Sequence, residues 1–289
     1  MNSSPFSSAP LRLQINGKSC LIHEAGSRFP EELDSASFWP RIMTAALSGR
    51  NRSSRAGAAG RGAVWFFSGP ELGLPFAVAV RQYRHGGLLR RLAGERFFSR
   101  RRFLRELEVH QRVLQLGIPV PQPLGVVAVS SGRRGWWGYF ASRWLAESVS
   151  LAGFLGVAPA EARLRAMAVI GSRLRRLHDD GIYYADLQVL NILVGPGPDH
   201  EIYFIDFDKS TRSASPLTAR RRRANLYRFF RSLEKFASRG GRWTPSERAA
   251  LLQAYETDPR KYLELCRSLG RGLVWRRLFY RPGWWLNRS

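Results

Sequence analysis

The sequence predicts an α+β protein whose first half is rich in strands and whose second half is mainly helical. Three observations support this. Residues 11–24 alternate apolar and polar side chains about an Asn-Gly pair, a pattern typical of a β-hairpin. Segments 159–180 and 217–236 carry apolar residues at helical spacing. Between these two segments, short apolar runs end in carboxylates, which is how strands deliver functional side chains.

The composition describes a globular chain with a strong positive charge. At 289 residues, of which 44% are hydrophobic, it is long enough for one large domain or two lobes. Lys and Arg outnumber Asp and Glu by 46 to 22, giving a formal charge of +24. Such a field favours a polyanionic partner, which is a nucleic acid, an acidic membrane surface or a phosphorylated glycolipid. Charge alone does not choose among these partners.

The cysteines and the hydrophobic pattern indicate the compartment in which the protein is expected. The two cysteines, Cys20 and Cys266, match no metal-binding or redox spacing, so a reducing compartment is expected. The first residues lack the basic and apolar regions of a secretory signal, and no run approaches the roughly 18 apolar residues of a membrane-spanning helix. We therefore expect a protein that is soluble or lies on a membrane surface.

The first half is expected to alternate strands with two helices. Residues 1–10 are rich in Ser and Pro and are predicted to be disordered. After the hairpin, a short helical region is expected over 30–46 and an amphipathic helix over 99–116, followed by a Pro-rich extended connection. The predicted strands that follow the hairpin are 76–83, 126–129 and 138–144.

A glycine-rich loop precedes the strand that begins near residue 64. Gly57, Gly60 and Gly62 form a Gly-x-x-Gly-x-Gly pattern in which small residues let backbone amides approach phosphates, and Arg61 adds charge. The pattern is not a P-loop, because no Gly-Lys-Ser/Thr follows. The alternative interpretation is an ordinary flexible hairpin.

Two charged residues of the first half are candidates for a phosphate-organising pair. Arg81 follows a run of apolar residues within the predicted strand 76–83, and a guanidinium can bind both phosphate oxygens and a carboxylate bidentately. Glu106, on the helix 99–116, is its candidate partner, and Glu108 is the competitor on another face. The alternatives are a solvent-facing strand residue for Arg81 and ordinary solvated helix charges for the two glutamates.

The chemistry of the second half is concentrated in residues 183–210. Asp186 is followed five positions later by Asn191, a strand is predicted over 192–194, and a second strand over 202–205 delivers Asp206. Phosphoryl transfer needs one carboxylate to deprotonate the attacking hydroxyl, and an amide oxygen and a second carboxylate to hold metal ions at the phosphates. Each residue could alone be a turn or cap residue. Their order favours the catalytic interpretation.

The remaining second-half segments are predicted to be helices and a basic tail. His178 closes the helix 159–180 and is interpreted as a buried packing or hydrogen-bonding residue. A further helix is expected from the Thr-Pro pair at 244. Residues 273–289 interleave Arg with Trp, Tyr and Phe, which suits an anionic membrane interface; packing on the protein and nucleic-acid binding are the alternatives.

In order, these features resemble the protein-kinase-like fold over residues 57–208. Within that superfamily, the segments GRGAVWF, VRQYRHGGLLRRL, GIPVPQPLG, YYADLQVLNILV, IDFDKS and RRANLYRFFRSLEK are similar to the lipopolysaccharide kinases, above all the 3-deoxy-D-manno-octulosonic acid (Kdo) kinases. The resemblance implies a bilobal fold, with an N-lobe over 11–145, a C-lobe over 146–272 and the basic segment 273–289 appended.

The resemblance also implies an activity and roles for individual residues. The expected reaction transfers the γ-phosphate of ATP to a sugar hydroxyl of the lipopolysaccharide inner core, with the 4-hydroxyl of Kdo as the acceptor, at the cytoplasmic face of the bacterial inner membrane. Asp186 would be the catalytic base, and Asn191 and Asp206 would bind Mg²⁺. Arg81 with Glu106 would organise the phosphates. The expected partners are a Kdo-lipid A precursor and an anionic membrane surface.

Four residues depart from the superfamily patterns. Arg81 stands where V-A-I-K has its Lys, and Tyr184 where a His is common. Gln188 stands where Asn is expected in Kdo kinases and Lys in protein kinases. Asp208 replaces the Gly of D-F-G, which fits lipopolysaccharide kinases and argues against a protein kinase. A heptose, small-molecule or protein kinase of the same fold stays open as an alternative. A nucleic-acid-binding protein with a degenerate kinase fold is the alternative from another class.

Overall fold

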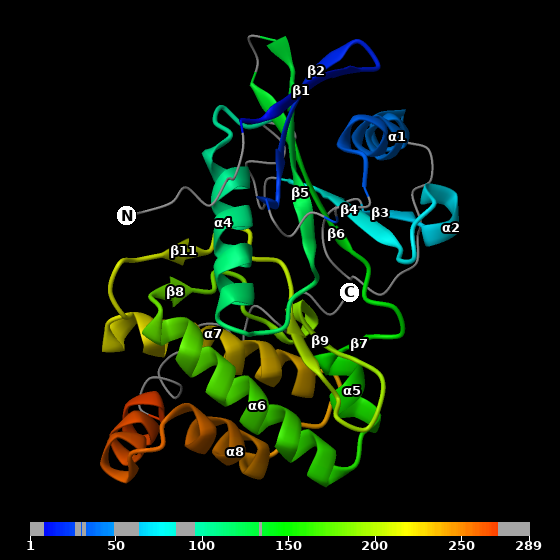
Figure 1. The fold of residues 1–289 in the computed structure, drawn as a ribbon. Coiled ribbons are helices and arrows are strands. Elements are labelled where there is room, and N and C mark those ends of the chain that lie inside the picture. The colour runs from blue at the N-terminus through cyan, green and yellow to red at the C-terminus, as the bar shows by residue number, and fades with distance from the viewer. Residues whose placement is uncertain are drawn as a thin grey trace. The chain divides into compact units, whose positions relative to one another are not determined.

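The computed structural model describes residues 9–26, 30, 33–48, 64–84, 96–132 and 135–270. The chain divides into two compact units between Ala146 and Glu147 (Figure 1). Gly57, Gly60 and Gly62 of the predicted glycine-rich loop lie outside the described residues, as do residues 1–8 and the basic segment 273–289. In the described part of the chain, no helix has both the length and the apolar character needed to cross a membrane.

The first unit is built on a six-stranded antiparallel sheet. Its strand order is β1-β2-β5-β6-β4-β3. The strands are β1 (Leu11–Ile15), β2 (Lys18–Glu24), β3 (Val64–Phe67), β4 (Val78–Gln82), β5 (Pro123–Ser130) and β6 (Trp136–Arg143). The predicted hairpin is present, since Ile15 pairs with Lys18 and the turn between them places Asn16 and Gly17 at φ 50° and 69°. Asn-Gly tolerates these left-handed dihedrals, which tight hairpins require.

Helices cover both faces of this sheet. Helix α1 (Ser35–Ser48) packs its buried residues against one side of β5, including Val127 and Val129. Helix α4 (Arg101–Gln115) packs against the alternate residues, including Val126 and Ala128. Successive side chains of a strand point to opposite faces, and both faces of β5 are covered, so its residues 123–129 are all apolar and buried. A short helix, α2 (Gly69–Leu72), follows β3 and was not predicted.

Close packing fixes where α4 lies on the sheet. A Cβ atom built at Gly138 of β6 would stand 2.3 Å from the Phe103 ring, so only glycine leaves room for that ring. Phe103 is almost fully buried and also packs on Tyr83, with ring centroids 4.6 Å apart. Seating Phe103 there positions the next turn of α4, which carries Glu106.

The second unit is mainly helical, as predicted. Its helices are α5 (Leu151–Val157), α6 (Ala160–Asp179), α7 (Ala219–Ala237) and α8 (Pro245–Tyr255), and residues 259–270 are also helical. The predicted apolar stripe of α7 is buried at Leu226, Phe229, Phe230 and Leu233. Helix α5 was not predicted. It begins at Ser150, whose hydroxyl accepts a hydrogen bond from the backbone N–H of Gly153.

Two small antiparallel sheets carry the loops of the second unit. One has the order β10-β9-β7, formed by β7 (Val149–Ser150), β9 (Ile192–Val194) and β10 (Ile202–Phe204). The other pairs β8 (Ile182–Tyr183) with β11 (Thr211–Arg212). The chain therefore returns after β10 to lie beside the strand that precedes Asp186.

Candidate active site

Asp186 lies in the loop between β8 and the 3-10 turn η3 (Val189–Asn191), where three side chains reach its carboxylate. The Nε2 of Gln188 and the Nδ2 of Asn191 donate to its Oδ2 at 2.9 and 3.0 Å. The guanidinium of Arg228, from α7, stands 3.6 Å from its Oδ1. The side chain of Asp186 is 46% exposed. The carboxylate is thus held on one oxygen and reachable by a substrate.

The β9–β10 hairpin brings Asn191 and Asp206 to the same end of the small sheet. Phe204 pairs with Ile192 across the hairpin, and the backbone N–H of Ile205 donates to the carbonyl of Asn191 at 3.0 Å. Asp206 therefore follows directly after the residue that pairs with Asn191. The structure brings together all three residues that the sequence singled out in this half.

Asp206 has a left-handed backbone, with φ 63°. Non-glycine residues adopt this conformation rarely, and Asp is among the few that do so at low cost. Its Oδ1 accepts a hydrogen bond from the backbone N–H of Asp208 at 3.3 Å. The turn ends the strand abruptly and sets the direction of the Asp206 side chain. Asp208 is not among the residues with positive φ, so its backbone does not require the superfamily Gly.

Tyr184 ties the catalytic loop to the hairpin. Its buried hydroxyl donates to the carbonyl of Asn191 at 3.0 Å and contacts the carbonyl of Ile205. Its ring stacks on Phe207, with centroids 4.8 Å apart. One phenol thus contacts the carbonyl of Asn191 and that of the residue just before Asp206. This gives Tyr184, a departure from the superfamily pattern, a structural role.

Hydrogen bonds from neighbouring elements fix the backbone of the catalytic loop. The N–H of Ala185 donates to the hydroxyl of Ser210 at 3.1 Å, and the N–H of Val189 donates to the hydroxyl of Ser232, on α7, also at 3.1 Å. The side chain of Asn225, also on α7, pairs with both backbone groups of Tyr184. The loop backbone around Asp186 is therefore determined on both sides of that residue.

Asn225 is in turn held by His178. Its Nδ2 donates to the carbonyl of Tyr184 at 2.7 Å, which leaves its Oδ1 to face the Nε2 of His178 at 3.0 Å. That nitrogen must carry the proton, so the Nδ1 of His178 accepts from the hydroxyl of Tyr255 at 2.8 Å. Burial lowers the pKa of His178 to about 4. The imidazole is neutral, and its predicted role as a buried hydrogen-bonding residue is confirmed.

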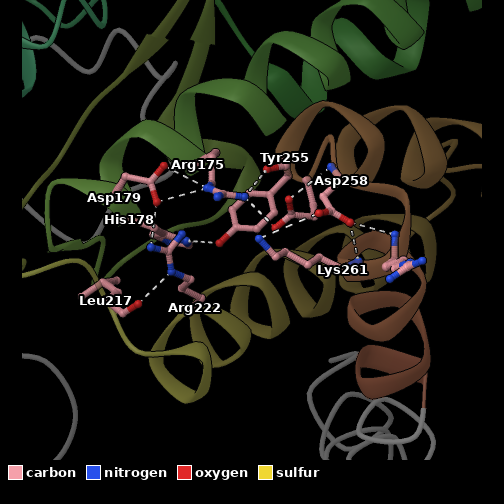
Figure 2. A network of polar contacts seen from close by, with 10 residues as sticks. Arg175, His178, Asp179, Leu217, Arg222, Tyr255, Asp258 and Lys261 are labelled. Atoms are coloured by element: carbon pink, nitrogen blue, oxygen red, sulfur yellow. Dashed lines mark hydrogen bonds and ion pairs between the residues drawn. The ribbon is translucent and has the colours of Figure 1, made fainter.

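Ion pairs surround this histidine and join three helices (Figure 2). Asp179 of α6 accepts from Arg175 at 2.9 Å and pairs with Arg222 of α7 at 2.7 Å. Arg175 also pairs with Glu256, the residue after α8, at 2.6 Å. Helices α6, α7 and α8 thus meet around His178, and α7 carries Asn225 from there to the catalytic loop.

In the first unit, Arg81 of β4 pairs with Glu106 of α4. The guanidinium donates to the Glu106 Oε1 at 2.6 Å, and the side chains are 23% and 1% exposed. Glu108 is exposed, so the geometry selects Glu106 from the two candidates. The guanidinium also lies 5.0 Å from the Tyr83 ring centroid, within cation–π range. Arg81 is therefore a paired residue rather than an ordinary solvent-facing strand residue.

A neutral histidine lies one turn of α4 beyond Glu106. Burial, with a smaller contribution from the charge of Arg81, lowers the pKa of His110 to about 4. Its Nε2 lies 2.7 Å from the carbonyl of Pro121 and therefore donates to it. His110 thus adds no charge beside the ion pair, and it joins α4 to the chain entering β5.

The oxygen groups of the second unit suit a magnesium ion. Mg²⁺ prefers carboxylate and amide oxygens and commonly takes only one or two protein ligands beside substrate phosphates. Asn191 directs its Nδ2 to Asp186, so its amide oxygen is the end available to a cation. Asp206 supplies a carboxylate on the adjacent strand end. The oxygen groups of these two residues are of the kind that Mg²⁺ binds, and their metal-binding role stays a prediction.

The residues that hold the catalytic loop from α7 were not predicted from the sequence. Arg228, Ser232 and Asn225 lie on α7 and were interpreted only as parts of a basic amphipathic helix. A polar residue within an apolar stripe is a signal that could have identified Asn225, since it is fully buried. The sequence has no comparable signal for Arg228, which is one of several arginines on the same helix.

Comparison with known proteins places the chain in a family. Residues 51–255 match the model of the lipopolysaccharide kinase (Kdo/WaaP) family. A 3-deoxy-D-manno-octulosonic acid kinase from Actinobacillus succinogenes is 34% identical over 210 residues, 69% of this chain and 83% of that protein. One from Photobacterium damsela subsp. piscicida is 29% identical over 219 residues, 73% of this chain and 82% of that protein.

Among solved structures, WaaP in complex with acyl carrier protein aligns with a TM-score of 0.49 and 17% identity, covering 69% of this chain and 77% of that one. The family match spans well over half of the chain, and the Actinobacillus relative exceeds 30% identity over most of its length. The chain belongs to the lipopolysaccharide kinase (Kdo/WaaP) family.

Proposed function

We propose that this protein transfers the γ-phosphoryl group of ATP to the 4-hydroxyl of Kdo in a Kdo-lipid A type precursor of the lipopolysaccharide inner core. The observation that carries the proposal is the cluster of Asp186, Asn191 and Asp206 on one loop and hairpin. Asn191 donates to the carboxylate of Asp186 at 3.0 Å and stands at the same strand end as Asp206. Phosphoryl transfer needs a base and metal-binding oxygens held close together, and this arrangement supports that reaction in a chain of the lipopolysaccharide kinase family.

Each of the three residues takes a separate role. Asp186 accepts the proton of the acceptor hydroxyl as it attacks, and its Oδ2 is fixed by Gln188 and Asn191 so that its Oδ1 faces the substrate. Asn191 and Asp206 hold Mg²⁺, which neutralises charge on the phosphates when bound. Tyr184 keeps the two metal-binding residues in register.

Residues of the first unit are assigned to the nucleotide. Glu106 holds the guanidinium of Arg81 in one orientation, and a guanidinium is a group that binds phosphate oxygens through parallel N–H donors. A guanidinium stays charged throughout, so it can replace an ammonium group in this role. Gly57, Gly60 and Gly62 are assigned to the phosphates on the basis of the sequence pattern alone.

We place the protein at the cytoplasmic face of the bacterial inner membrane, as a peripheral protein. The acceptor of the proposed reaction is a glycolipid, and a formal charge of +24 favours an anionic surface. The Arg and aromatic residues of the segment 273–289 suit the headgroup region.

The test of this function is phosphate transfer from labelled ATP with Mg²⁺ to three acceptors: a Kdo-lipid A precursor, a heptosylated core and a general protein substrate. Label on the Kdo precursor alone, located at the 4-hydroxyl by NMR, is expected. Label only on the heptosylated core would move the acceptor within the same family. Absence of label from every acceptor, with salt-sensitive binding of RNA or DNA, would overturn the kinase assignment.

The base is tested by substituting it beside a matched carboxylate. Asp186→Ala should abolish transfer while ATP binding is retained, because the residue acts on the acceptor hydroxyl. Asp199→Ala, at an exposed position of the β9–β10 loop, removes the same group from the same unit and should leave transfer unchanged. Activity retained in Asp186→Ala would remove that residue from the role of base.

A further inference from the structure

Arg228 is held against the catalytic loop by its own helix. Ser232 lies one turn further along α7, and its hydroxyl accepts the backbone N–H of Val189 at 3.1 Å. Residues four apart share a face of a helix, so the bond at Ser232 turns the face bearing Arg228 toward the loop. The guanidinium stands 3.6 Å from the Oδ1 of Asp186, and its side chain is 46% exposed.

The two oxygens of Asp186 have different surroundings. Oδ2 accepts from Gln188 at 2.9 Å and from Asn191 at 3.0 Å. Oδ1 has the guanidinium of Arg228 beside it, at a distance longer than an N–H···O hydrogen bond. Oδ1 is therefore the oxygen that can accept a proton from a substrate hydroxyl, and whatever binds there lies next to Arg228.

This position separates Arg228 from the metal side of the site. Asn191, a proposed metal ligand, contacts Oδ2, whereas Arg228 contacts Oδ1. Gln188 is uncharged and already donates to Asp186. Within the described residues, the ion pair found for Asp186 is with Arg228. Arg228 lies beside Oδ1, the oxygen assigned to the acceptor hydroxyl.

We propose that Arg228 binds an anionic group of the acceptor, a carboxylate or a phosphate close to the reacting hydroxyl, and so selects anionic sugars. The inference rests on the proposed function, because it assigns the acceptor side of the same site. A guanidinium binds carboxylate or phosphate through two parallel hydrogen bonds, and the ion pair found for this exposed one within the described part of the chain is the long contact to Asp186. Binding there brings the acceptor hydroxyl to Oδ1.

The experiment compares three acceptors with the full-length protein. They are the Kdo-lipid A precursor, the same precursor with the Kdo carboxylate converted to its primary amide, and the precursor without its lipid A phosphates. Wild-type kcat/KM should fall roughly tenfold or more for the acceptor that lacks the recognised anion. Arg228→Gln should lose that preference because its kcat/KM for the anionic acceptor falls to the value for the acceptor without the anion. Arg228→Lys should recover part of the preference. If the preference of the parent precursor over the amide depends on Arg228, the recognised anion is the Kdo carboxylate. If the preference over the form without phosphates depends on Arg228, the recognised anion is a phosphate.

Arg220→Gln is the matched control. Arg220 is exposed in the first turn of the same helix, so the variant carries the same change of net charge. It should keep the full preference of the wild type, and a loss equal to that of Arg228→Gln would show only a long-range effect of charge. Preferences that survive intact in Arg228→Gln would overturn the proposal. An equal fall in kcat on all three acceptors, with unchanged acceptor KM, would assign Arg228 to the transferred phosphoryl group instead.

A binding measurement keeps this result apart from the fate of the proposed function. If the wild type phosphorylates none of the acceptors, the proposed reaction is wrong. Calorimetric binding of the water-soluble acid and amide head groups to wild type, Arg228→Gln and Arg220→Gln then makes the same comparison without turnover. Tighter binding of the acid, or of inorganic phosphate titrated into the same proteins, that depends on Arg228 alone supports the site, and equal binding of both anions by all three proteins rejects it.

Discussion

Glu106 carries a carboxylate in a position that water hardly reaches, because its side chain is 1% exposed. Breaking a buried ion pair by removing one partner leaves an uncompensated charge, whereas replacing both partners with apolar groups is often neutral. Arg81 is less buried than Glu106, at 23% exposure, so part of its charge is screened. The pair therefore has a structural role that is separable from its role toward a nucleotide.

This separation can be measured with methionine substitutions. Arg81→Met should lower the free energy of unfolding by about 3 kcal/mol, because Glu106 is left buried without this partner. Arg81→Met with Glu106→Met should recover most of that stability in urea denaturation while phosphate transfer stays low. Arg81→Lys should retain partial transfer, since an ammonium can reach both groups. A double variant as unstable as the single one would contradict the argument.

Tyr184 joins the two sides of the β9–β10 hairpin through one atom, its hydroxyl oxygen. Its hydroxyl contacts the carbonyls of Asn191, just before β9, and of Ile205, just after β10, so it joins the chain at the two proposed metal ligands. Tyr184→Phe keeps the stacking on Phe207 and removes only this hydroxyl. The backbone anchors from Asn225 are unaffected by the change.

Tyr184→Phe should therefore raise the Mg²⁺ concentration needed for half-maximal transfer several-fold. The cost in stability should be about 1 kcal/mol, the usual contribution of one hydrogen bond. A magnesium titration of the initial rate, with thermal melting of the same samples, checks both. An unchanged magnesium requirement would mean that the β9–β10 hairpin keeps its register without the phenol.

At the scale of elements, α7 links the three-helix contact around His178 to the catalytic loop. The side chain of Asn225 accepts a hydrogen bond from His178 and also bonds the backbone of Tyr184. The neutral state of the imidazole is necessary for this arrangement, since its Nδ1 must accept from Tyr255. Protonation would turn that acceptor into a donor facing the tyrosine hydroxyl. The link should consequently depend on pH.

The pKa of His178 gives the sign and the pH window of that dependence. Its folded value of about 4 lies below the ordinary value of 6.5, so the unfolded chain takes up the proton first as the pH falls. The stability that neutral His178 contributes to the folded protein is fully present above pH 6.5 and is lost as the pH falls toward 4. The loss amounts to at most about 3 kcal/mol. Urea denaturation at both ends should show His178→Gln less stable than wild type at pH 7, with the gap closing by roughly 2 kcal/mol near pH 4.5. A gap that stays constant would contradict this.

The sequence predicted elements better than the contacts between them. The hairpins 11–24 and 192–204 were predictable because local turn chemistry and alternation determine them. The boundaries of α1 were shifted, since Asp34 accepts the N–H of Ala36 and the helix begins after it, at Ser35. Asn225 and Ser232 of α7 bond the catalytic loop from sequence separations of 41 and 43, and no local pattern in one sequence predicts such a pairing. The pairing of Arg81 with Glu106 was predictable only because the resemblance supplied the expectation.

At the scale of the whole molecule, the excess of arginine has two separate uses. Within the described residues, several arginines are consumed by internal ion pairs, including those at 81, 163, 175 and 222. Others are exposed, including those at 101, 105, 239 and 260. The formal charge of +24 is therefore only partly a surface field, and a distributed field must be distinguished from a localised membrane contact.

Truncation distinguishes the two. Deleting residues 273–289 removes four arginines and the aromatic residues interleaved with them, and leaves most of the basic excess in place. If the segment is the membrane contact, binding to phosphatidylglycerol vesicles should fall on the order of tenfold or more, because juxtamembrane bases contribute about 1 kcal/mol each and the rings add apolar contact. Replacing Arg101, Arg105, Arg239 and Arg260 with Gln changes the charge equally and should have a smaller effect. Vesicle sedimentation at low and physiological salt makes the comparison, with neutral phosphatidylcholine vesicles as the baseline. Equal losses of vesicle binding in the two variants would show that net charge governs membrane binding. Unchanged binding after truncation would favour the alternative that the segment packs on the protein.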